Sequence, residues 1–317
     1  MREWLKAFAL WPVRGFNRLF LSAFYAFMGG RYRLSPAGGL QNKRILVLAP
    51  HVDDEVIGCG GYLSDLSGRD RDNMIQCIYM TDGAASIHPT MSGEEIARAR
   101  VEEGRRVASF YGFEPPVFLG EADGNLAVEP ATVHKLHPFI EAFEPEVVFL
   151  PCFLDGHRDH VATAGIGLQA MAKAGLPGDL PLYLYAVNSP LTYYAANRVF
   201  LMDNEWKVKK RALAIFKSQT LPFEIFLTLD RCRKHAIKGS QRRGAKGAEF
   251  FVASTLKEYH RAYALYGPEM YRNFQQISSP FNLVSHFFSG WPLKKEAGEH
   301  LGALEPQEPS PRLSPRG

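Results

Sequence analysis

The feature that most constrains the fold is a regular alternation of apolar runs and helix-like segments. Apolar runs of strand length occupy residues 43–50, 73–83, 115–120, 146–153 and 181–188. Helical patterns lie between them, at residues 55–68, 92–113, 131–145 and 160–175. Buried apolar strands that alternate with helices are typical of βαβ units in a parallel sheet. The pattern therefore predicts an α/β, Rossmann-like, doubly wound and mostly parallel sheet with helices on both faces.

Beyond about residue 190 the alternation fades, and we expect helices and loops that wrap the same domain. The last segment, residues 293–317, is rich in Pro, Glu and Ser and poor in apolar residues. Such a composition cannot bury enough apolar surface to offset the entropy of ordering, so a disordered tail is predicted there.

Composition excludes several classes of protein. The four cysteines lie far apart and form no C-x-x-C pair, which argues against a disulfide scaffold and a cysteine-built zinc site. Cys77 and Cys152 lie in apolar runs, which favours core thiols in a reducing, cytoplasmic compartment. The net charge of +4 is mild and no nucleic-acid motif accompanies it, so we expect no nucleic-acid partner.

Two charged clusters follow predicted core strands. "PHVDDE" ends the first strand, at residues 50–55, and "DGHRDH" follows the fourth, at residues 155–160. In open α/β sheets, ligands bind outside the carboxyl ends of the strands, near the topological switch point. The first and fourth strands of a doubly wound sheet are commonly neighbours, so the two clusters are expected to face one crevice.

The residue types in these clusters suit metal-dependent hydrolysis. His51, Asp54 and His160 supply two imidazoles and one carboxylate, a common ligand set for catalytic zinc with a fourth position left for water. Asp53 would then serve as the general base. His157 would stabilise the oxyanion or protonate the leaving group, and Asp159 would fix the tautomer of a nearby histidine.

Each cluster also has a plain structural interpretation. Acidic residues at a helix N-terminus can serve as a cap, and "DGHRDH" can form a polar turn. The occurrence of both clusters at the ends of predicted core strands favours a site. The glycines of "GCGG", residues 58–61, do not indicate a phosphate loop, because the full fingerprint is missing and the acids before them would repel phosphate.

The paired motifs resemble those of the PIG-L/LmbE-like family of metal-dependent N-acetylglucosaminyl deacetylases. The family signature reads PHPDDE and HPDH, where this chain has PHVDDE and HRDH. Val52 and Arg158 replace prolines of the motifs, and neither proline ligates the metal. Arg100 and Glu103 match an R-x-x-E of the family, and "FLGEADG", "KSQ" and "GAEFF" match further pieces. The resemblance covers roughly residues 43–255.

The resemblance implies a role for each matched position. His51, Asp54 and His160 would bind the metal, Asp53 would be the base, and His157 would stabilise the oxyanion with Asp159 orienting it. Arg100 and Asp123 match positions that hold the sugar. Zinc (Zn²⁺) is the usual metal, while ferrous iron (Fe²⁺) or another divalent ion serves some members.

The resemblance also implies an activity, which is hydrolysis of the acetamide of an N-acetylated hexosamine in a glycoconjugate, with release of acetate. Two alternatives stay open. One is a catalytically silent member that binds a sugar or a partner, and the other is a deacylase of a non-sugar amide. The expected organisation is an N-terminal extension (1–42), the deacetylase domain (43–255), a C-terminal helical and loop extension (256–292) and the tail (293–317).

The N-terminal extension carries its own apolar pattern. The residues that recur at helical spacing are Phe16, Leu19, Phe20, Ala23, Phe24 and Phe27. The uncharged runs are shorter than the roughly 20 residues that span a bilayer. The helix would therefore pack on the protein body or a second subunit of a homo-oligomer, or lie in a membrane interface. The second alternative would place the protein on the inner face of the membrane and make a lipid-linked sugar a plausible substrate.

Overall fold

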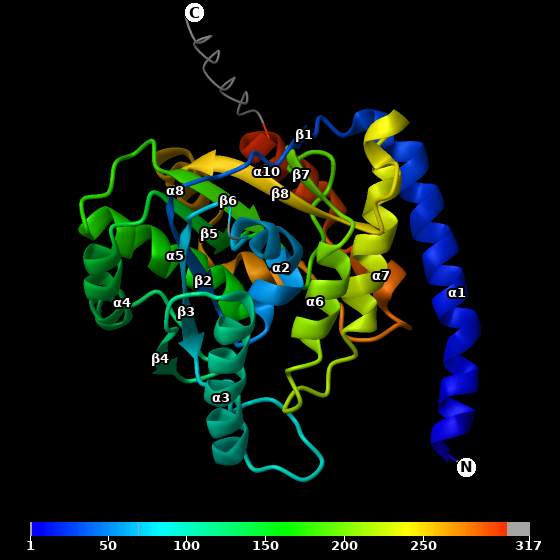
Figure 1. Ribbon diagram of the computed structural model, residues 1–317, viewed down its shortest axis with the longest axis horizontal. Coiled ribbons are helices and arrows are strands. Elements are labelled where there is room, and N and C mark those ends of the chain that lie inside the picture. Colours follow the sequence, from blue (N-terminus) through cyan, green and yellow to red (C-terminus); the bar gives the residue numbers. More distant parts are fainter. Residues whose placement is uncertain (1, 69, 303–317) are drawn as a thin grey trace, which may run out of the picture.

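The structure is a computed structural model that describes residues 2–68 and 70–302. Within them the strands form one sheet in the order β1-β7-β8-β6-β5-β2-β3-β4 (Figure 1). The strands are β1 (Ser35–Pro36), β2 (Arg44–Ala49), β3 (Met74–Thr81), β4 (Val117–Glu121), β5 (Val147–Pro151), β6 (Pro181–Tyr185), β7 (Arg198–Met202) and β8 (Gly247–Thr255).

The half of the sheet that contains β2 to β6 is parallel, as the sequence predicts. β2 pairs with β3 on one side and with β5 on the other, in a register that places Ile45 opposite Val147. The predicted first and fourth strands are therefore neighbours. Their carboxyl ends, which carry the two charged clusters, lie side by side at one edge of the sheet.

The prediction that only helices and loops follow residue 190 is wrong. β8 runs antiparallel to both β6 and β7, and β1 adds a short parallel pair to β7. The sequence hides β8 because Glu249 interrupts its apolar run. Glu249 is buried in the structure, where its carboxylate lies 2.7 Å from the Lys209 ammonium. A pairing between residues this far apart cannot be read from the chain.

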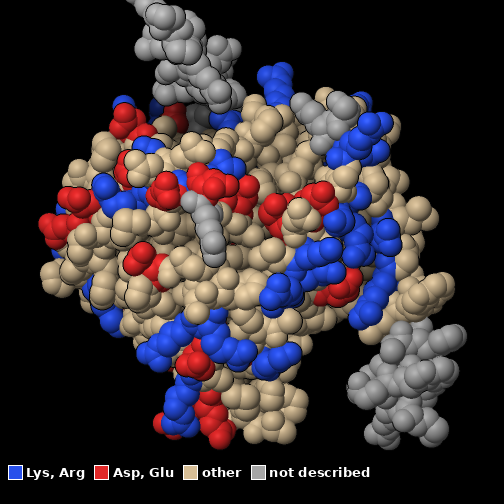
Figure 2. All heavy atoms as spheres, viewed as in Figure 1, with Lys and Arg blue, Asp and Glu red and all other residues tan. Residues whose placement is uncertain are grey.

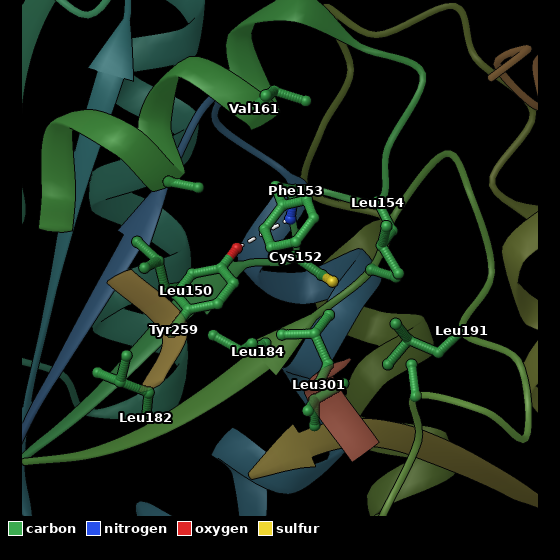
Figure 3. Packing of buried hydrophobic residues seen from close by; sticks show 14 of the residues in the cluster. Leu150, Cys152, Phe153, Leu154, Val161, Leu182, Leu184, Leu191, Tyr259 and Leu301 are labelled. Atoms are coloured by element: carbon green, nitrogen blue, oxygen red, sulfur yellow. Dashed lines mark hydrogen bonds between the residues drawn. The ribbon is translucent and has the colours of Figure 1, made fainter. Parts of the chain in front are cut away.

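Helices cover both faces of the sheet, which confirms the predicted fold class. They are α1 (Arg2–Met28), α2 (Asp54–Leu66), α3 (Gly93–Tyr111), α4 (Pro130–Phe143), α5 (Arg158–Lys173), α6 (Glu205–Leu213), α7 (Glu224–Arg233), α8 (Leu256–Tyr266), α9 (Leu283–Phe287) and α10 (Trp291–Gly302). One core lies among α2, α3, α6 and the sheet. The other lies among α4, α5, α8 and the opposite face, where the Tyr259 hydroxyl accepts a hydrogen bond from the Phe153 amide at 2.8 Å (Figure 3).

The glycines of the "GCGG" run allow α2 to approach the sheet closely. A Cβ on Gly61 would lie 2.3 Å from the Met202 sulfur, and one on Gly58 would lie 2.3 Å from the Tyr185 ring. The Glu249 carboxylate accepts the backbone N–H of Gly61 at 2.8 Å. These glycines therefore serve helix–sheet packing and not the cradling of a phosphate.

α1 packs on the protein body through one face and leaves another face exposed. Leu21 and Tyr25 are fully buried, and the Phe24 ring lies 5.2 Å from the Phe287 ring of α9. On the outer face, Leu19 is 74% exposed and Phe27 is 83% exposed. Among the described residues, no helix combines the length and apolarity needed to cross a membrane.

The prediction of disorder from residue 293 is wrong for residues 293–302, which belong to α10. Lys294, Ala297 and Leu301 form a buried stripe on this helix at helical spacing. Three positions among many polar residues were too few to stand out in the composition. Residues 303–317 of the predicted tail lie outside the described residues.

Candidate metal-dependent active site

The two charged clusters meet at the carboxyl ends of β2 and β5. The loop after β2 carries His51 and leads into α2, and the loop after β5 leads into α5, which carries His160. Asp54 Oδ2 lies 3.0 Å from His51 Nδ1 and 3.2 Å from His160 Nε2. Ligand atoms of these three side chains lie within 4.8 Å of one another. Two imidazoles and a carboxylate at this spacing fit the donor set of a catalytic Zn²⁺.

A second carboxylate supports His160 from behind. Asp155 Oδ2 lies 3.3 Å from His160 Nδ1, and the Asp155 carboxylate accepts the backbone N–H groups of His157 at 2.8 Å and Asn188 at 3.0 Å. Carboxylates that orient a metal-binding histidine in this way are common. The sequence interpretation missed Asp155, although it opens the "DGHRDH" cluster.

The charges around His160 favour a bound cation. Burial alone would lower the pKa of His160, but the carboxylates of Asp54 and Asp155 outweigh burial and raise the pKa to about 10. The same holds for His51. Burial would lower its pKa, but Asp123, Asp159 and Asp54 outweigh burial and raise the pKa. The site thus holds more negative than positive charge when both imidazoles are neutral. A divalent ion would supply the missing charge.

Asp159 contacts two of the histidines in different ways. Its carboxylate lies 3.3 Å from His51 Nε2 and accepts the backbone N–H groups of Gly124 at 2.7 Å and Leu126 at 3.1 Å. It reaches His157 only through its backbone N–H, which donates to His157 Nδ1 at 3.2 Å. The carboxylate therefore contacts His51, which fits the expectation that Asp159 fixes the tautomer of a nearby histidine, while the orientation of His157 implied by the resemblance rests on the backbone N–H alone. His51, His157 and Asp159 form a second group with metal-ligand spacing.

His157 is held as a neutral imidazole. Burial, followed by the charges of His160 and His51, lowers its pKa to about 4. Because Nδ1 accepts from the Asp159 amide, the proton of this tautomer sits on Nε2. His157 also lines the pocket described below, so this N–H is suited to donate to an oxygen of a bound molecule.

Asp53 combines burial, backbone strain and polar support. Its φ of 152° lies in a region that favours glycine, and strain of this kind is concentrated at functional sites. Its Oδ2 accepts hydrogen bonds from Gln219 Nε2 at 2.9 Å and from Arg100 at 3.3 Å. Burial raises the pKa of Asp53 despite the opposing charge of Arg100. A carboxylate with a raised pKa is a suitable general base.

Arg100 and Glu103 both support Asp53. The Arg100 guanidinium donates to the Val52 carbonyl as well as to Asp53. Glu103 accepts from the Ser218 amide at 2.8 Å and from its hydroxyl at 2.6 Å, which fixes the loop that carries Gln219. The R-x-x-E pair therefore holds the proposed base in place. The sequence matched "KSQ" but did not identify Gln219 as a partner of Asp53.

One pocket of about 400 Å³ is lined by His51, Asp53, Asp54, His157 and His160. Arg100 and Asp123, which were expected to hold the sugar, both line it. Asp123 is also tied to the proposed metal site, since its Oδ1 lies 3.1 Å from His51 Nε2. Further lining residues that the sequence interpretation missed are Ser86, Val187, Asn188, Gln219, Thr220, Gln276 and Ser278.

Comparison with known proteins agrees with the motifs. The model of the PIG-L family, described as GlcNAc-PI de-N-acetylase, matches residues 46–171. The diacetylchitobiose deacetylase of Thermococcus kodakarensis is 29% identical over 191 residues, which are 56% of this chain and 70% of that protein.

Solved structures share the fold. The N,N'-diacetylchitobiose deacetylase of Pyrococcus horikoshii superposes with a TM-score of 0.56 at 21% identity, covering 69% of this chain and 86% of that one. GalB, the 4-carboxy-2-hydroxymuconate hydratase of Pseudomonas putida KT2440, gives 0.57 at 18% identity, covering 67% and 95%. At these identities the likeness shows the fold alone, and that fold carries more than one chemistry. The family match itself is confined to residues 46–171, which resemble the PIG-L domain.

Proposed function

We propose that the protein is a metal-dependent N-deacetylase that hydrolyses the acetamide of an N-acetylated hexosamine in a glycoconjugate and releases acetate. One observation carries the proposal. His51, Asp54 and His160 converge in the same pocket as the strained, buried Asp53. The substrate class is supported by the Thermococcus kodakarensis relative, which is a diacetylchitobiose deacetylase.

The metal we propose is Zn²⁺, held by His51, Asp54 and His160, although the same donors would accept Fe²⁺ or another divalent ion. When bound, the ion would supply Lewis-acid activation of water and of the acetamide carbonyl. Asp155 orients His160 for ligation, and Asp159 orients His51.

Asp53 would take the proton from the attacking water. Gln219 and Arg100 hold the same oxygen, Oδ2, which fixes the carboxylate and leaves Oδ1 for the incoming proton. The raised pKa of Asp53 strengthens it as a base. We therefore propose that Arg100 positions the base and that Asp123 contacts the sugar at the pocket wall.

His157 would stabilise the developing oxyanion. Its lowered pKa keeps it neutral at pH 7, and its Nε2–H is the free donor. A hydrogen bond that strengthens as negative charge develops lowers the barrier. The proton that Asp53 takes from water can then pass to the departing amine, while His157 keeps its own.

Acetate release tests the proposal. The metal-free protein, and the protein reloaded with Zn²⁺, would be incubated with N-acetylglucosamine and with N,N'-diacetylchitobiose. We expect acetate and free amine only after reloading, and only from acetylated sugars. Metal binding without turnover of any sugar would favour the catalytically silent alternative.

We also propose that α1 docks on an anionic lipid surface, at the inner face of the cytoplasmic membrane. The exposed face of α1 carries Trp11, which is 78% exposed, together with Leu19 and Phe27. Lys and Arg gather over the neighbouring α6–α7 side (Figure 2). Burial, followed by the charges of Arg242, Arg18 and Arg231, lowers the pKa of Lys234 in this cluster, so the cations lie close together. Apolar side chains beside cations suit an anionic membrane.

α1 contacts the segment that also lines the pocket, and we therefore favour a lipid-linked sugar as the substrate. Asn17 of α1 donates to the Pro280 carbonyl at 2.6 Å, and the next residue, Phe281, is 68% exposed. Flotation with vesicles of anionic lipid tests docking. We expect the double substitution Leu19→Asp and Phe27→Asp to abolish flotation, whereas Leu265→Asp, on the exposed side of α8, retains it. Equal flotation of the wild type and both variants would refute docking. If the wild type instead self-associates and the double variant does not, the occupant of this face is a second copy of the chain.

A further inference from the structure

One wall of the pocket comes from outside the catalytic motifs. Gln276, Ile277 and Ser278 line the pocket, on an irregular stretch between the 3₁₀ helix η4 (Pro268–Asn273) and α9. This stretch lies well beyond residue 171, where the matched family domain ends. We call residues 276–278 the C-terminal wall.

The C-terminal wall rests directly on the loop that carries the metal-site residues. A Cβ on Gly156 would lie 3.0 Å from the Phe274 carbonyl oxygen and 3.2 Å from the Gln276 nitrogen. The Gln276 amide Nε2 donates to the Gly156 carbonyl at 3.2 Å. The Ile277 amide donates to the Asn188 carbonyl at 3.3 Å. Gly156 lies between Asp155 and His157 in the chain, so the wall contacts the loop directly beside two residues of the proposed active site.

The wall is fixed from the opposite side by contacts with the C-terminal segment and α1. His286 Nδ1 lies 2.7 Å from the Gln276 carbonyl oxygen, and the Ser278 amide donates to Asn282 Oδ1 at 3.3 Å. The bond from Asn17 to Pro280 joins the same stretch to α1. Supported on both sides, the wall can present side chains in a defined geometry.

Two polar groups of the wall are left for a ligand. Gln276 uses its Nε2 for Gly156, and no donor among the described residues contacts its Oε1. The Ser278 hydroxyl oxygen accepts from Asn282 Nδ2 at 3.1 Å, which leaves its O–H free to donate. An acceptor beside a donor matches sugar hydroxyls, which both donate and accept. By contrast, Gln219, Arg100 and Asp159 are already engaged with the proposed catalytic residues.

We propose that Gln276 and Ser278 determine substrate specificity by hydrogen-bonding the hydroxyl groups of the glycan. This inference rests on the proposed function. Because both residues touch the sugar and not the reacting acetamide, they contribute binding that is the same in the ground state and in the transition state. Loss of such binding raises KM and leaves kcat nearly unchanged.

The test uses the full-length, zinc-loaded protein with N,N'-diacetylchitobiose as substrate. We expect Gln276→Ala and Ser278→Ala each to raise KM by roughly three- to tenfold, the effect of one net hydrogen bond, with kcat within about twofold of wild type. Gln275→Ala is the matched control, because this neighbouring glutamine is exposed and does not line the pocket. Zinc content should be unchanged in all three variants. Gln276→Ala and Ser278→Ala, which also lose their bonds to Gly156 and Asn282, should melt at a slightly lower temperature, and Gln275→Ala should not.

Three outcomes separate this inference from the proposed function. Turnover by wild type with an unchanged KM in both variants would overturn the specificity role alone. A fall in kcat at constant KM would also overturn it, because that result marks a positioning role. Failure of the wild-type protein to release acetate would overturn the proposed function, and this inference with it.

Discussion

Lys294 offers a test of how the C-terminal segment is built around the proposed metal site. Its ammonium group is buried on α10, where it donates to the Phe287 carbonyl at 3.2 Å and lies 5.5 Å from the centre of the Phe274 ring. Burial lowers the pKa of Lys294 from 10.5 to about 8, although Asp155 and Cys152 act in the opposite direction. The folded protein therefore holds this proton less tightly than the unfolded chain.

The size of the effect follows from the two pKa values. They differ by about 2.5, and each pKa unit corresponds to about 1.4 kcal/mol, so the buried charge costs about 3 kcal/mol when protonated. That cost is fully present below pH 8. It disappears as the pH rises from about 8 towards 10.5, because the folded state loses the proton first.

The substitution Lys294→Met keeps most of the length of the unbranched side chain and removes the charge. At pH 7 we expect the variant to gain about 3 kcal/mol and to lose about 1 kcal/mol for the hydrogen bond to Phe287, a net gain of about 2 kcal/mol. At pH 9.5 the gain from charge removal shrinks by about 2 kcal/mol, so the variant and wild type should be nearly equal.

Urea unfolding followed by circular dichroism, in metal-free buffer at both pH values, measures the difference. Comparison of variant with wild type cancels the titration of the buried tyrosines and cysteines. Lys295→Met is the control, since Lys295 is exposed on the same helix, and its effect should not depend on pH. A stability difference between Lys294→Met and wild type that stays constant from pH 7 to 9.5 would refute the reasoning.

Three further predictions concern the site itself. Asp155→Asn should weaken Zn²⁺ binding by roughly 10- to 100-fold in a competitive chelator titration, because His160 loses the carboxylate that orients it; unchanged affinity would deny that role. Zinc uptake should release at least one proton at pH 7, because the pKa of His160 is raised to about 10 and the metal must displace that proton. Calorimetry in buffers of different ionisation enthalpy detects the released proton. The absence of proton release would contradict the assignment of His160 as a ligand. Asp53→Gly should have a free energy of unfolding about 1–3 kcal/mol higher than Asp53→Ala, because glycine relieves the backbone strain; urea unfolding measures the difference. Equal stability of the two variants would show that φ at this position is not costly.

The parallel half of the sheet could be predicted because each of its strands is a continuous apolar run between helices. The placement of His51 and His160 followed from the pairing of β2 with β5, a general property of doubly wound sheets. Local pattern and global topology agree in this part of the chain, so the sequence alone was sufficient.

The remainder depended on contacts between distant residues. β8 was not predicted because Glu249 interrupts its apolar run. The Lys209 ammonium that pairs with Glu249 lies on α6, far away in the chain. The partner of Asp159 depended on which loop faces it, since only the folded chain brings His51 within 3.3 Å of its carboxylate. Gln276 gave no signal in the sequence, because a single glutamine in a loop carries no pattern until the fold places it beside Gly156.

The exposed face of α1 shows why two interpretations of one pattern can both describe part of a helix. The periodic residues include Phe24, which packs on the body, and Leu19, which faces outward. Periodicity indicates that a helix is amphipathic, but it does not say how many apolar faces the helix has or what covers each of them.

The central claim is that Asp53 acts as a base beside a metal that it does not bind. Its most direct test is the substitution Asp53→Asn, with zinc content measured by elemental analysis and acetate release measured on N,N'-diacetylchitobiose. The account predicts one zinc per chain, as in wild type, with kcat lowered by roughly 10²-fold or more, the usual scale for general-base catalysis. His160→Ala, the matched loss of a ligand, should lose the zinc. Loss of zinc in Asp53→Asn, or turnover near that of wild type, would contradict the account.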